Sequence, residues 1–372
     1  MKKMILILLL SVLTWTAAYG QSIHFICFAN TNDNKIGKGV AKDVTLMLDF
    51  VMSLAEKLGM EENLKPAVVM MGDDCSPLRL KSVISDFNCG PKDIVIFYYS
   101  GHGIRSFSDT SEFPQMCLGS NTQKDYIPLE YVKDELEMKG ARLCLVIGDC
   151  CNNYSNAVLS KDNTLTAASW PSHHKSNSEG LKKLFLEAKG TIIASSSKRG
   201  QYSWVNSTQG GFFTLGFLEE LEEYTSDPGI SHNWNELMRR TISRVEDISR
   251  KALKEKGGYI QTPIFRVEHP VEIAPIRLDE GIYKALTVIA DQALPQTHRI
   301  RHYESILKTL FASDGCMVDV VGQDMRTIVD YRTASQYLLR VATVSSVSDF
   351  KILEQQKDAS GKISYLKILE IH

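Results

Sequence analysis

A histidine and a cysteine each follow an apolar run that predicts a buried strand. His102 comes soon after the run Ile94–Tyr99, and Cys151 comes soon after the run Leu143–Ile147. The carboxyl ends of neighbouring parallel strands meet at one edge of a sheet, where these side chains could form a nucleophile–base pair. A cysteine thiolate beside a histidine attacks amide carbonyls at neutral pH. The two positions therefore predict peptide-bond hydrolysis.

Such an attack also requires backbone N–H groups that are directed at the developing oxyanion. Glycines flank His102 and permit close backbone approach, so the N–H of Gly103 is a candidate donor, together with the N–H of Cys151. Cys150 precedes Cys151 directly, and the residues alone leave open which of the two is the nucleophile. A thiol redox role for the pair is the less favourable alternative, because adjacent cysteines close a strained ring when they pair.

Alternating strands and helices are expected to position these residues. Short apolar runs that end in polar loops predict strands, and apolar residues that recur every three to four positions predict helices. Their order predicts an α/β fold with a mostly parallel central sheet and helices on both faces. The predicted strands are His24–Phe28, Ala67–Met71, Ile94–Tyr99, Leu143–Ile147 and Thr191–Ser195, and the predicted helices are Val40–Leu58, Pro77–Phe87, Leu129–Met138, Phe212–Tyr224 and Trp234–Leu253.

The periodic pattern lapses between about 152 and 190, which predicts a flexible loop. A domain boundary is predicted at 270–279, followed by a small accessory α+β domain of unknown role over 280–372. Its predicted elements are a largely helical Gly281–Phe311, the strands Met317–Val321, Phe350–Leu353 and Ser364–Ile368, and a hairpin turn at 358–362.

The N-terminus predicts a secretory signal peptide over residues 1–20. It has a basic start, an apolar stretch from Met4 to Leu13, and the small-x-small sequence Ala18-Tyr19-Gly20. The apolar stretch is too short to span a membrane, and no cysteine lies near the cleavage point to carry a lipid. We expect export without a membrane anchor, to the periplasm or the extracellular space; a buried N-terminal helix is the alternative.

The overall composition is that of an ordinary globular protein. Hydrophobic residues make up 44%, charged residues 23%, and the net charge is −2. The sequence has no basic stretch, which excludes a typical nucleic-acid-binding protein. Eight cysteines in an exported chain leave one or two disulfides open, for example among Cys75, Cys89 and Cys117. No C-x-x-C pair occurs, which argues against a structural zinc site.

Four motifs resemble those of the caspase-like cysteine peptidases of the metacaspase type (clan CD). Tyr99–Gly103 is similar to their histidine motif and Asp149–Cys151 to their Asp-x-Cys nucleophile motif. Gly211–Thr214 is similar to the Gly-x-Phe-Thr that opens a late helix, and Gln261–Pro263 to the Gln-x-Pro of a closing strand. The resemblance covers roughly 22–267, about two thirds of the chain. It implies a three-layer caspase-like sandwich, assigned here to residues 21–272.

The same resemblance implies a catalytic dyad of Cys151 and His102, with the preceding cysteine in the variable position of the motif. It also implies that Asp43, Ser100 and Asp149 line the pocket for the side chain before the scissile bond. Acidic pocket residues favour Lys or Arg by charge pairing. Caspases themselves cut after Asp and use arginines that have no evident equivalent here. The expected substrates are therefore peptides or proteins with Lys or Arg before the scissile bond.

The processing of this family into large and small subunits implies self-cleavage within the 152–190 loop. A peptidase specific for basic residues could cut itself there. The candidate positions are Lys161, Lys175, Lys182 and Lys183.

The sequence departs from the family pattern in two places. The nucleophile is followed by Asn152-Asn153-Tyr154 instead of His-Ser-Gly, which leaves the substrate-side loop undefined. Many metacaspases bind calcium through clustered aspartates, whereas the acidic residues beyond the histidine are scattered here. These are Asp109, Glu112 and Asp125. No cofactor or metal is therefore expected, and calcium dependence is disfavoured.

A non-catalytic caspase-like protein, in which the fold and the C-terminal domain serve binding or assembly, is the alternative function. Family members that have lost activity usually lose the histidine or the cysteine, and this chain keeps both His102 and Cys151. The oligomeric state is left open.

Overall fold

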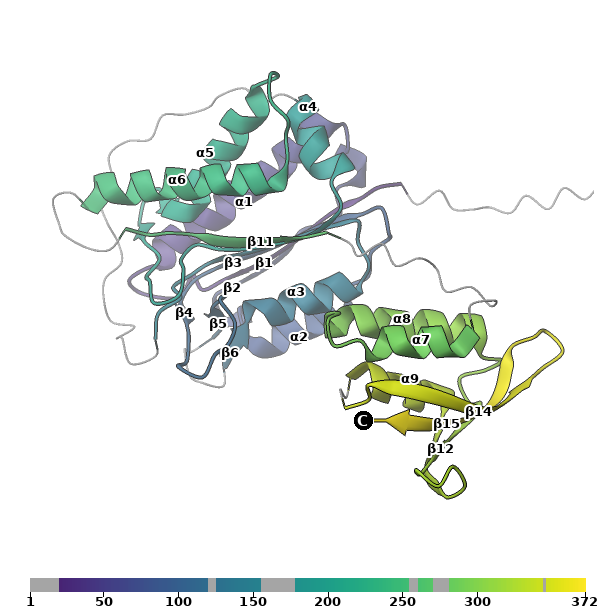
Figure 1. Ribbon diagram of the computed structural model, residues 1–372. Coiled ribbons are helices and arrows are strands. Elements are labelled where there is room, and N and C mark those ends of the chain that lie inside the picture. The colour runs from purple at the N-terminus through teal and green to yellow at the C-terminus, as the bar shows by residue number, and fades with distance from the viewer. Residues whose placement is uncertain (1–19, 120–124, 155–177, 254–259, 270–280, 344–345) are drawn as a thin grey trace, which may run out of the picture. The chain divides into compact units, whose positions relative to one another are not determined.

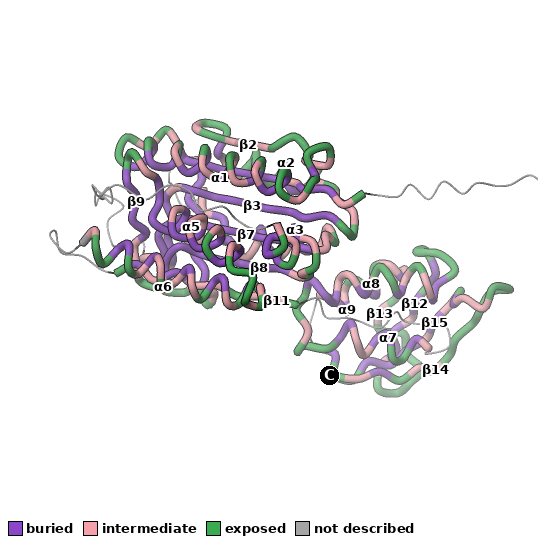
Figure 2. The backbone as a smooth tube through the Cα atoms, turned by 90° about the horizontal axis from the view of Figure 1, so that it is seen from above, coloured by how far each residue is buried: buried purple, intermediate pink, exposed green. Residues whose placement is uncertain are grey.

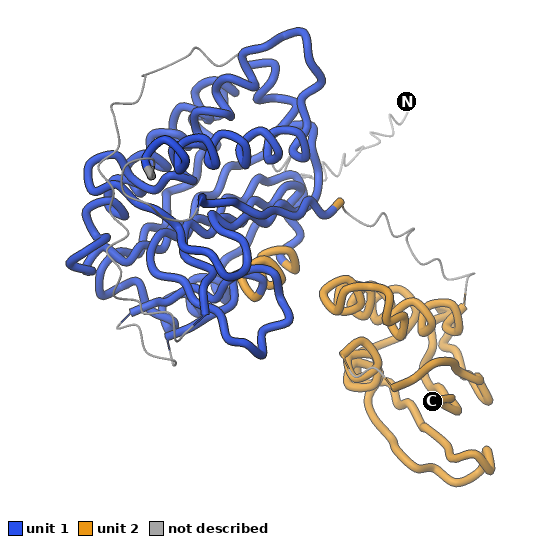
Figure 3. Tube along the Cα trace, turned by 60° about the vertical axis from the view of Figure 1, so that its left-hand side comes forward, with its two compact units in different colours: residues 1–130, 139–268 blue, residues 131–138, 269–372 orange. Residues whose placement is uncertain are grey.

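The computed structural model describes residues 20–119, 125–154, 178–253, 260–269, 281–343 and 346–372. The chain separates into two compact units (Figure 3). The first unit comprises Met1–Glu130 and Lys139–Glu268, and the second comprises Tyr131–Met138 and His269–His372. Apart from residue 20, the predicted signal peptide lies outside the described residues. None of the helices in the described ranges is long and apolar enough to cross a membrane.

A six-stranded sheet forms the centre of the first unit, with strand order β11-β8-β7-β3-β1-β2 (Figure 1). Neighbouring strands are parallel except for β11, which runs antiparallel to β8. Every residue of β3 and β7 is buried, because helices cover both faces of the sheet. The strands are β1 (Ile23–Ala29), β2 (Val68–Met71), β3 (Ile94–Ser100), β7 (Leu143–Asp149), β8 (Gly190–Ser195) and β11 (Ile264–Glu268).

The helices of this unit complete the layers. Figure 1 shows α1 (Gly37–Leu58), α5 (Phe212–Ser226) and α6 (Trp234–Leu253) on one face of the sheet and α2 (Pro77–Asp86) on the other. The apolar side of α1 packs on the strands through buried residues that include Val44, Met47 and Val51. Figure 2 shows the buried strands running between the partly exposed helices. The predicted α/β fold with a mostly parallel sheet is confirmed.

Part of the predicted 152–190 loop is helical, so the predicted loop was too long. α4 (Ser178–Leu181) continues into a π-helical turn at Lys182–Glu187 (η4). Leu181, Leu184 and Phe185 are buried at helical spacing, and this short apolar stripe stabilises the segment against the core. Residues 155–177, with two of the four candidate cleavage lysines, lie outside the described residues.

Short strands that the sequence pattern did not predict surround the edge of the central sheet. They form a three-stranded sheet in the order β4-β5-β6 and a β9-β10 pair. Strands of two or three residues are too short for an alternating pattern to stand out. They are β4 (Gly103–Ile104), β5 (Gln115–Cys117), β6 (Tyr126–Pro128), β9 (Val205–Asn206) and β10 (Gly210–Gly211).

The C-terminal part of the chain is α+β, as predicted, with a hydrophobic core of its own. Three helices accompany a four-stranded sheet in the order β13-β12-β15-β14. β13 and α9 were not predicted. The helices are α7 (Gly281–Ala290), α8 (Gln296–Leu310) and α9 (Ala334–Thr343), and the strands are β12 (Met317–Val321), β13 (Ile328–Thr333), β14 (Asp349–Lys357) and β15 (Ile363–Ile371). Within the second unit, α3 (Leu129–Met138) contributes Tyr131–Met138.

Candidate active site

The pairing of β3 with β7 brings the two chemical motifs together. The strands are parallel and in register from Ile94 opposite Leu143 to Ser100 opposite Asp149. The N–H of Gly101 extends this pairing by donating to the carbonyl of Asp149 at 3.2 Å. His102 and Cys151 each lie two residues beyond a strand end, so they emerge at the same edge of the sheet.

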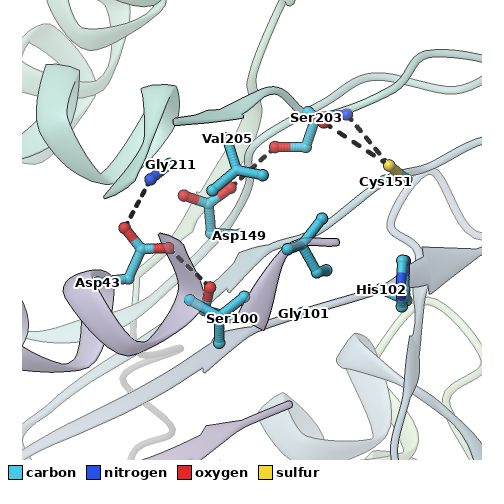
Figure 4. A pocket seen from close by; sticks show the side chains of 11 residues that line it. Asp43, Ser100, Gly101, His102, Asp149, Cys151, Ser203, Val205 and Gly211 are labelled. Atoms are coloured by element: carbon cyan, nitrogen blue, oxygen red, sulfur yellow. Dashed lines mark hydrogen bonds between the residues drawn. The ribbon is translucent and has the colours of Figure 1, made fainter. Parts of the chain in front are cut away.

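Both side chains line one narrow pocket at this edge (Figure 4). The three predicted acidic and hydroxyl residues line the same pocket, so the structure brings together five of the six predicted site residues there. The cavity measures about 20 Å³. Its lining residues are Ile36, Val40, Asp43, Ser100, Gly101, His102, Asp149, Cys151, Ser203, Val205 and Gly211.

The first acidic residue of the pocket comes from α1. Asp43 is 1% exposed, and its two carboxyl oxygens have different partners. Oδ2 accepts from the hydroxyl of Ser100 at 2.8 Å, and Oδ1 accepts from the N–H of Gly211 at 2.6 Å. Sequence reasoning had assigned Ser100 only as a residue that lines the pocket. In the structure its hydroxyl also holds the Asp43 carboxyl in place.

The second acidic residue is the last residue of β7. Asp149 is 5% exposed and accepts from the Ser203 hydroxyl at 2.9 Å. Its other oxygen accepts from both the hydroxyl of Thr214 at 2.7 Å and the N–H of Thr214 at 3.1 Å. The motif that resembles Gly-x-Phe-Thr therefore has a physical role, since its threonine and the start of α5 neutralise part of a buried charge.

Burial raises the proton affinity of both carboxyls. Burial raises the pKa of Asp149, and burial together with the charge of Asp149 raises the pKa of Asp43 well above its usual range. Among the described residues, neither carboxyl forms an ion pair with a lysine, arginine or histidine; their partners are hydroxyl and amide groups. Within the described ranges, the partners of both acids in this pocket are therefore neutral groups.

The adjacent cysteines have different surroundings. Cys151 lines the pocket, and the Ser203 N–H is directed at its sulfur from 3.3 Å. Cys150 is 1% exposed, its N–H donates to the Ser196 hydroxyl, and its carbonyl accepts from the hydroxyls of Ser196 and Ser197. Burial also raises the pKa of the Cys150 thiol well above its usual range. Of the two cysteines, Cys151 is the one that lines the pocket.

His102 has a carboxylate partner that sequence reasoning missed. Its Nε2 lies 3.0 Å from Oδ2 of Asp33, in the loop between β1 and α1. Burial alone would raise the pKa of Asp33, but hydrogen bonds from the Ile36 amide, from His102 and from the Lys35 amide lower it. The polar run Asn30–Asn34 at the end of the first strand was the available signal, because that strand ends at the same edge of the sheet.

Gly103 lies against the nucleophile segment. A Cβ atom at this position would be only 2.1 Å from the carbonyl oxygen of Cys151, so a larger residue requires the backbone to move. The N–H of Cys117 donates to the His102 carbonyl, which makes Gly103 and Met116 a non-hydrogen-bonded pair of the β4-β5 ladder. The Gly103 N–H therefore points away from β5, to the side on which the Arg105 N–H meets the 152–154 segment.

The asparagine after the nucleophile connects the two active-site loops. Asn152 is fully buried, and its Oδ1 accepts from Arg105, also fully buried, at 2.8 Å. Its Nδ2 donates to the carbonyls of Glu112 and Ser197 at 2.8 and 3.0 Å. Where the motif that it resembles often has His-Ser-Gly, this chain thus has a buried amide that connects the segment after Cys151 to the segment after His102.

The cysteines considered for disulfides are not bonded to one another. All eight cysteines lie within the described residues, and the structure contains no disulfide among them. Cys75 and Cys117 are buried, and burial raises the pKa of the Cys75 thiol to about 12. The disulfides left open among Cys75, Cys89 and Cys117 are therefore absent. The buried Cys75 and Cys117 fill space as small hydrophobic groups.

Among the acidic residues considered for calcium, Asp109 is engaged in other hydrogen bonds. Asp109 accepts from the Ser106 N–H at 2.7 Å and from the Gln115 amide at 2.9 Å, which fixes a turn. In the part of the chain that the structure describes, no group of three or more His, Cys, Asp or Glu is arranged to hold a metal ion.

We predict that Asn152→Ala destabilises the protein by about 2–4 kcal/mol, because it removes three side-chain hydrogen bonds and leaves the buried Arg105 without its side-chain acceptor. Denaturant unfolding measures this loss. Asn153→Ala is the matched control, since the Asn153 carbonyl that Arg105 uses belongs to the backbone and remains. Equal stability of the two variants would show that the Asn152 amide does not connect the loops.

Comparison with known proteins supports the chemistry of this edge. No curated protein matches the chain significantly. A family model described as the caspase domain matches residues 28–272, which is well over half of the chain and includes every residue of the pocket. The chain therefore belongs to the caspase-domain family of cysteine peptidases.

Proposed function

We propose that this protein is an endopeptidase that cleaves peptide bonds after Lys or Arg, with Cys151 as nucleophile and His102 as its acid–base partner. One observation carries the proposal: the pocket beside Cys151 contains two buried carboxyls, Asp43 and Asp149, whose partners in the described structure are neutral donors. A substrate cation would supply a counter-charge to them.

The energetics of buried charge favour a basic side chain in this pocket. A buried carboxylate without a cation is unfavourable, which is why the pKa values of Asp43 and Asp149 are raised. A guanidinium or ammonium group restores charge balance, and its donors can bind carboxylate oxygens directly. An acidic substrate side chain would add a third negative charge. The apolar walls at Ile36, Val40 and Val205 suit the methylene stem of Lys or Arg.

The remaining residues fit the steps of acyl transfer. The Cys151 thiolate attacks the carbonyl carbon, and the Gly103 and Cys151 N–H groups are the proposed donors to the oxyanion. His102 gives its proton to the leaving amine, which leaves a thioester on Cys151. Water, activated by His102, then hydrolyses the thioester and regenerates the thiol.

The pocket must widen when a substrate enters. Its cavity of about 20 Å³ has room for roughly one water molecule. Val205 belongs to the two-residue strand β9, which pairs with β10. It approaches α1 closely, since a Cβ on Gly39 would lie 2.3 Å from its methyl group. We expect β9 to shift when a Lys or Arg side chain binds.

We predict that Cys151→Ala abolishes the cleavage of fluorogenic Arg and Lys peptides, because it removes the nucleophile. Cys150→Ala is the matched control and should retain most activity, since Cys150 is buried and is not among the residues that line the pocket. The assay compares peptides with Arg, Lys or Asp before the scissile bond. A wild-type protein that is inactive before and after limited processing would favour the non-catalytic binding or assembly protein.

We predict that Asp43→Asn lowers kcat/KM for Arg and Lys peptides at least about 100-fold while the protein becomes no less stable. The amide oxygen can still accept from the Gly211 N–H, and its NH2 can donate to Ser100, so the buried charge disappears without an orphaned partner. Since a raised carboxyl pKa means that the folded state holds the proton more tightly, wild-type stability falls as pH rises through that pKa. The Tm advantage of Asp43→Asn should therefore grow with pH.

The affinity for basic peptides should rise over the same pH interval, because the cation binds the ionised carboxyls. Steady-state kinetics at several pH values measure this trend, and thermal unfolding measures the stability. A variant that loses stability but keeps its preference for Arg would contradict the assignment of Asp43 to the specificity pocket.

Export and self-processing complete the proposal. They rest on the signal-like N-terminus and on the lysines between the nucleophile and β8. Lys161 and Lys175 are the preferred cleavage positions, because Lys183 is on a helical segment and pairs with Glu187 at 2.8 Å. Mass spectrometry of the purified mature protein should show a new N-terminus near residue 21 and a cut after Lys161 or Lys175. Cys151→Ala should lack the internal cut but keep the same N-terminus.

A further inference from the structure

We propose that Asp33 is a positioning residue that turns the cysteine–histidine pair into a Cys151–His102–Asp33 triad. This inference rests on the proposed peptidase function and goes beyond it, because the motifs that carry that function contain no third member. It follows from the contacts of His102 and Asp33.

The Asp33 carboxylate is fixed on both sides. Oδ1 accepts from the N–H groups of Lys35 and Ile36 at 2.8 and 2.9 Å, and the backbone carbonyl of Asp33 accepts from the Gly37 N–H at 2.9 Å. Oδ2 is directed at Nε2 of His102 at 3.0 Å. Since the backbone at the start of α1 holds one oxygen, the other can orient an imidazole ring.

The contact also decides which ring nitrogen carries the hydrogen. An ionised carboxylate only accepts hydrogen bonds, so Nε2 must be the donor. Nδ1 is then the nitrogen that is left to exchange a proton with Cys151. When the ring takes that proton it becomes a cation, and the Asp33 charge stabilises it at the moment of reaction.

His102 lines two cavities, and its two proposed partners, Cys151 and Asp33, line different ones. The pocket with Cys151 does not include Asp33 among its lining residues. A second cavity of about 470 Å³ is lined by Asp33 and His102 and does not include Cys151. Asp33 and Cys151 therefore adjoin His102 in different cavities, as a triad requires. Asp33 is also 69 positions away from His102 in sequence, so no local motif records the pair.

The same unit contains a matched control pair. His24 Nε2 lies 2.9 Å from Asp93 Oδ2, and Asp93 also accepts from two backbone amides, those of Ser22 and Gly90. This pair is at the start of β1 and just before β3, the ends opposite the active site. It repeats the histidine–carboxylate contact of the Asp33–His102 pair at the end of the sheet opposite Cys151.

The test is Asp33→Asn. The asparagine Oδ1 can still accept from the Lys35 and Ile36 amides, but its NH2 would face Nε2 as a donor and move the ring hydrogen to Nδ1. We expect kcat for an Arg peptide to fall about 10²- to 10⁴-fold with KM within about twofold, as for a histidine held in the wrong tautomer. Asp93→Asn should lower Tm to a similar extent and leave kcat within about twofold.

Further readouts distinguish a positioning role from a structural one. Alkylation of Cys151 by iodoacetamide, followed by peptide mapping, should slow at least about tenfold in Asp33→Asn and remain unchanged in Asp93→Asn. This readout needs no peptide substrate, so it tests the triad even if wild type cleaves neither Arg nor Lys peptides. Asp33→Glu, which keeps the charge, should recover part of kcat.

Several results would overturn the inference. The first is a decrease of kcat in Asp33→Asn that is no larger than the decrease in Asp93→Asn. The second is an Asp33→Asn variant in which KM rises while kcat is unchanged. If Asp33→Asn does not fold, nitrogen NMR of the wild-type imidazole decides. The inference requires a hydrogen on Nε2 of His102, and a neutral ring that carries its hydrogen on Nδ1 contradicts it.

Discussion

The active site depends on the register between two parallel strands. Ser100 pairs with Asp149, and from that point each strand needs only two more residues to present His102 and Cys151 at one edge. Successive residues of a strand point to opposite faces, so a slip of one position would send Asp149 and its hydrogen bonds away from the pocket. The continuous apolar runs of β3 and β7, buried on both faces, stabilise this register.

The start of α1 combines two tasks. Asp33 contacts His102 before the helix begins, and Asp43 lines the proposed specificity pocket from inside the helix. Ile36 and Val40, between them, line that pocket. The segment 33–43 thus contacts the proposed acid–base residue at one end and the proposed site of the substrate cation at the other. Its backbone amides hold Asp33 in place. A displacement of this segment would affect both tasks together.

The buried carboxyls show how function conflicts with stability. Asp43 and Asp149 are expensive to bury, yet hydroxyl and amide donors satisfy their oxygens one by one. The fold therefore tolerates the pair without neutralising it. In the proposed function, the ionised carboxyls bind the basic side chain of the substrate. The same buried carboxyls lower the folding stability of the protein when no substrate is bound.

The sequence alone determined the α/β class, the two strand-end motifs and the family, because buried parallel strands and glycine-flanked turns leave patterns within a few consecutive residues. Tertiary structure alone decided which residues complete the site. Ser203 meets Cys151 from 52 positions away and Asp33 meets His102 from 69, and contacts of such range leave no periodic signal. The helix at Ser178–Glu187 and the strands β4 to β6 were missed for a related reason: short elements are stabilised by what they pack against, not by their own pattern.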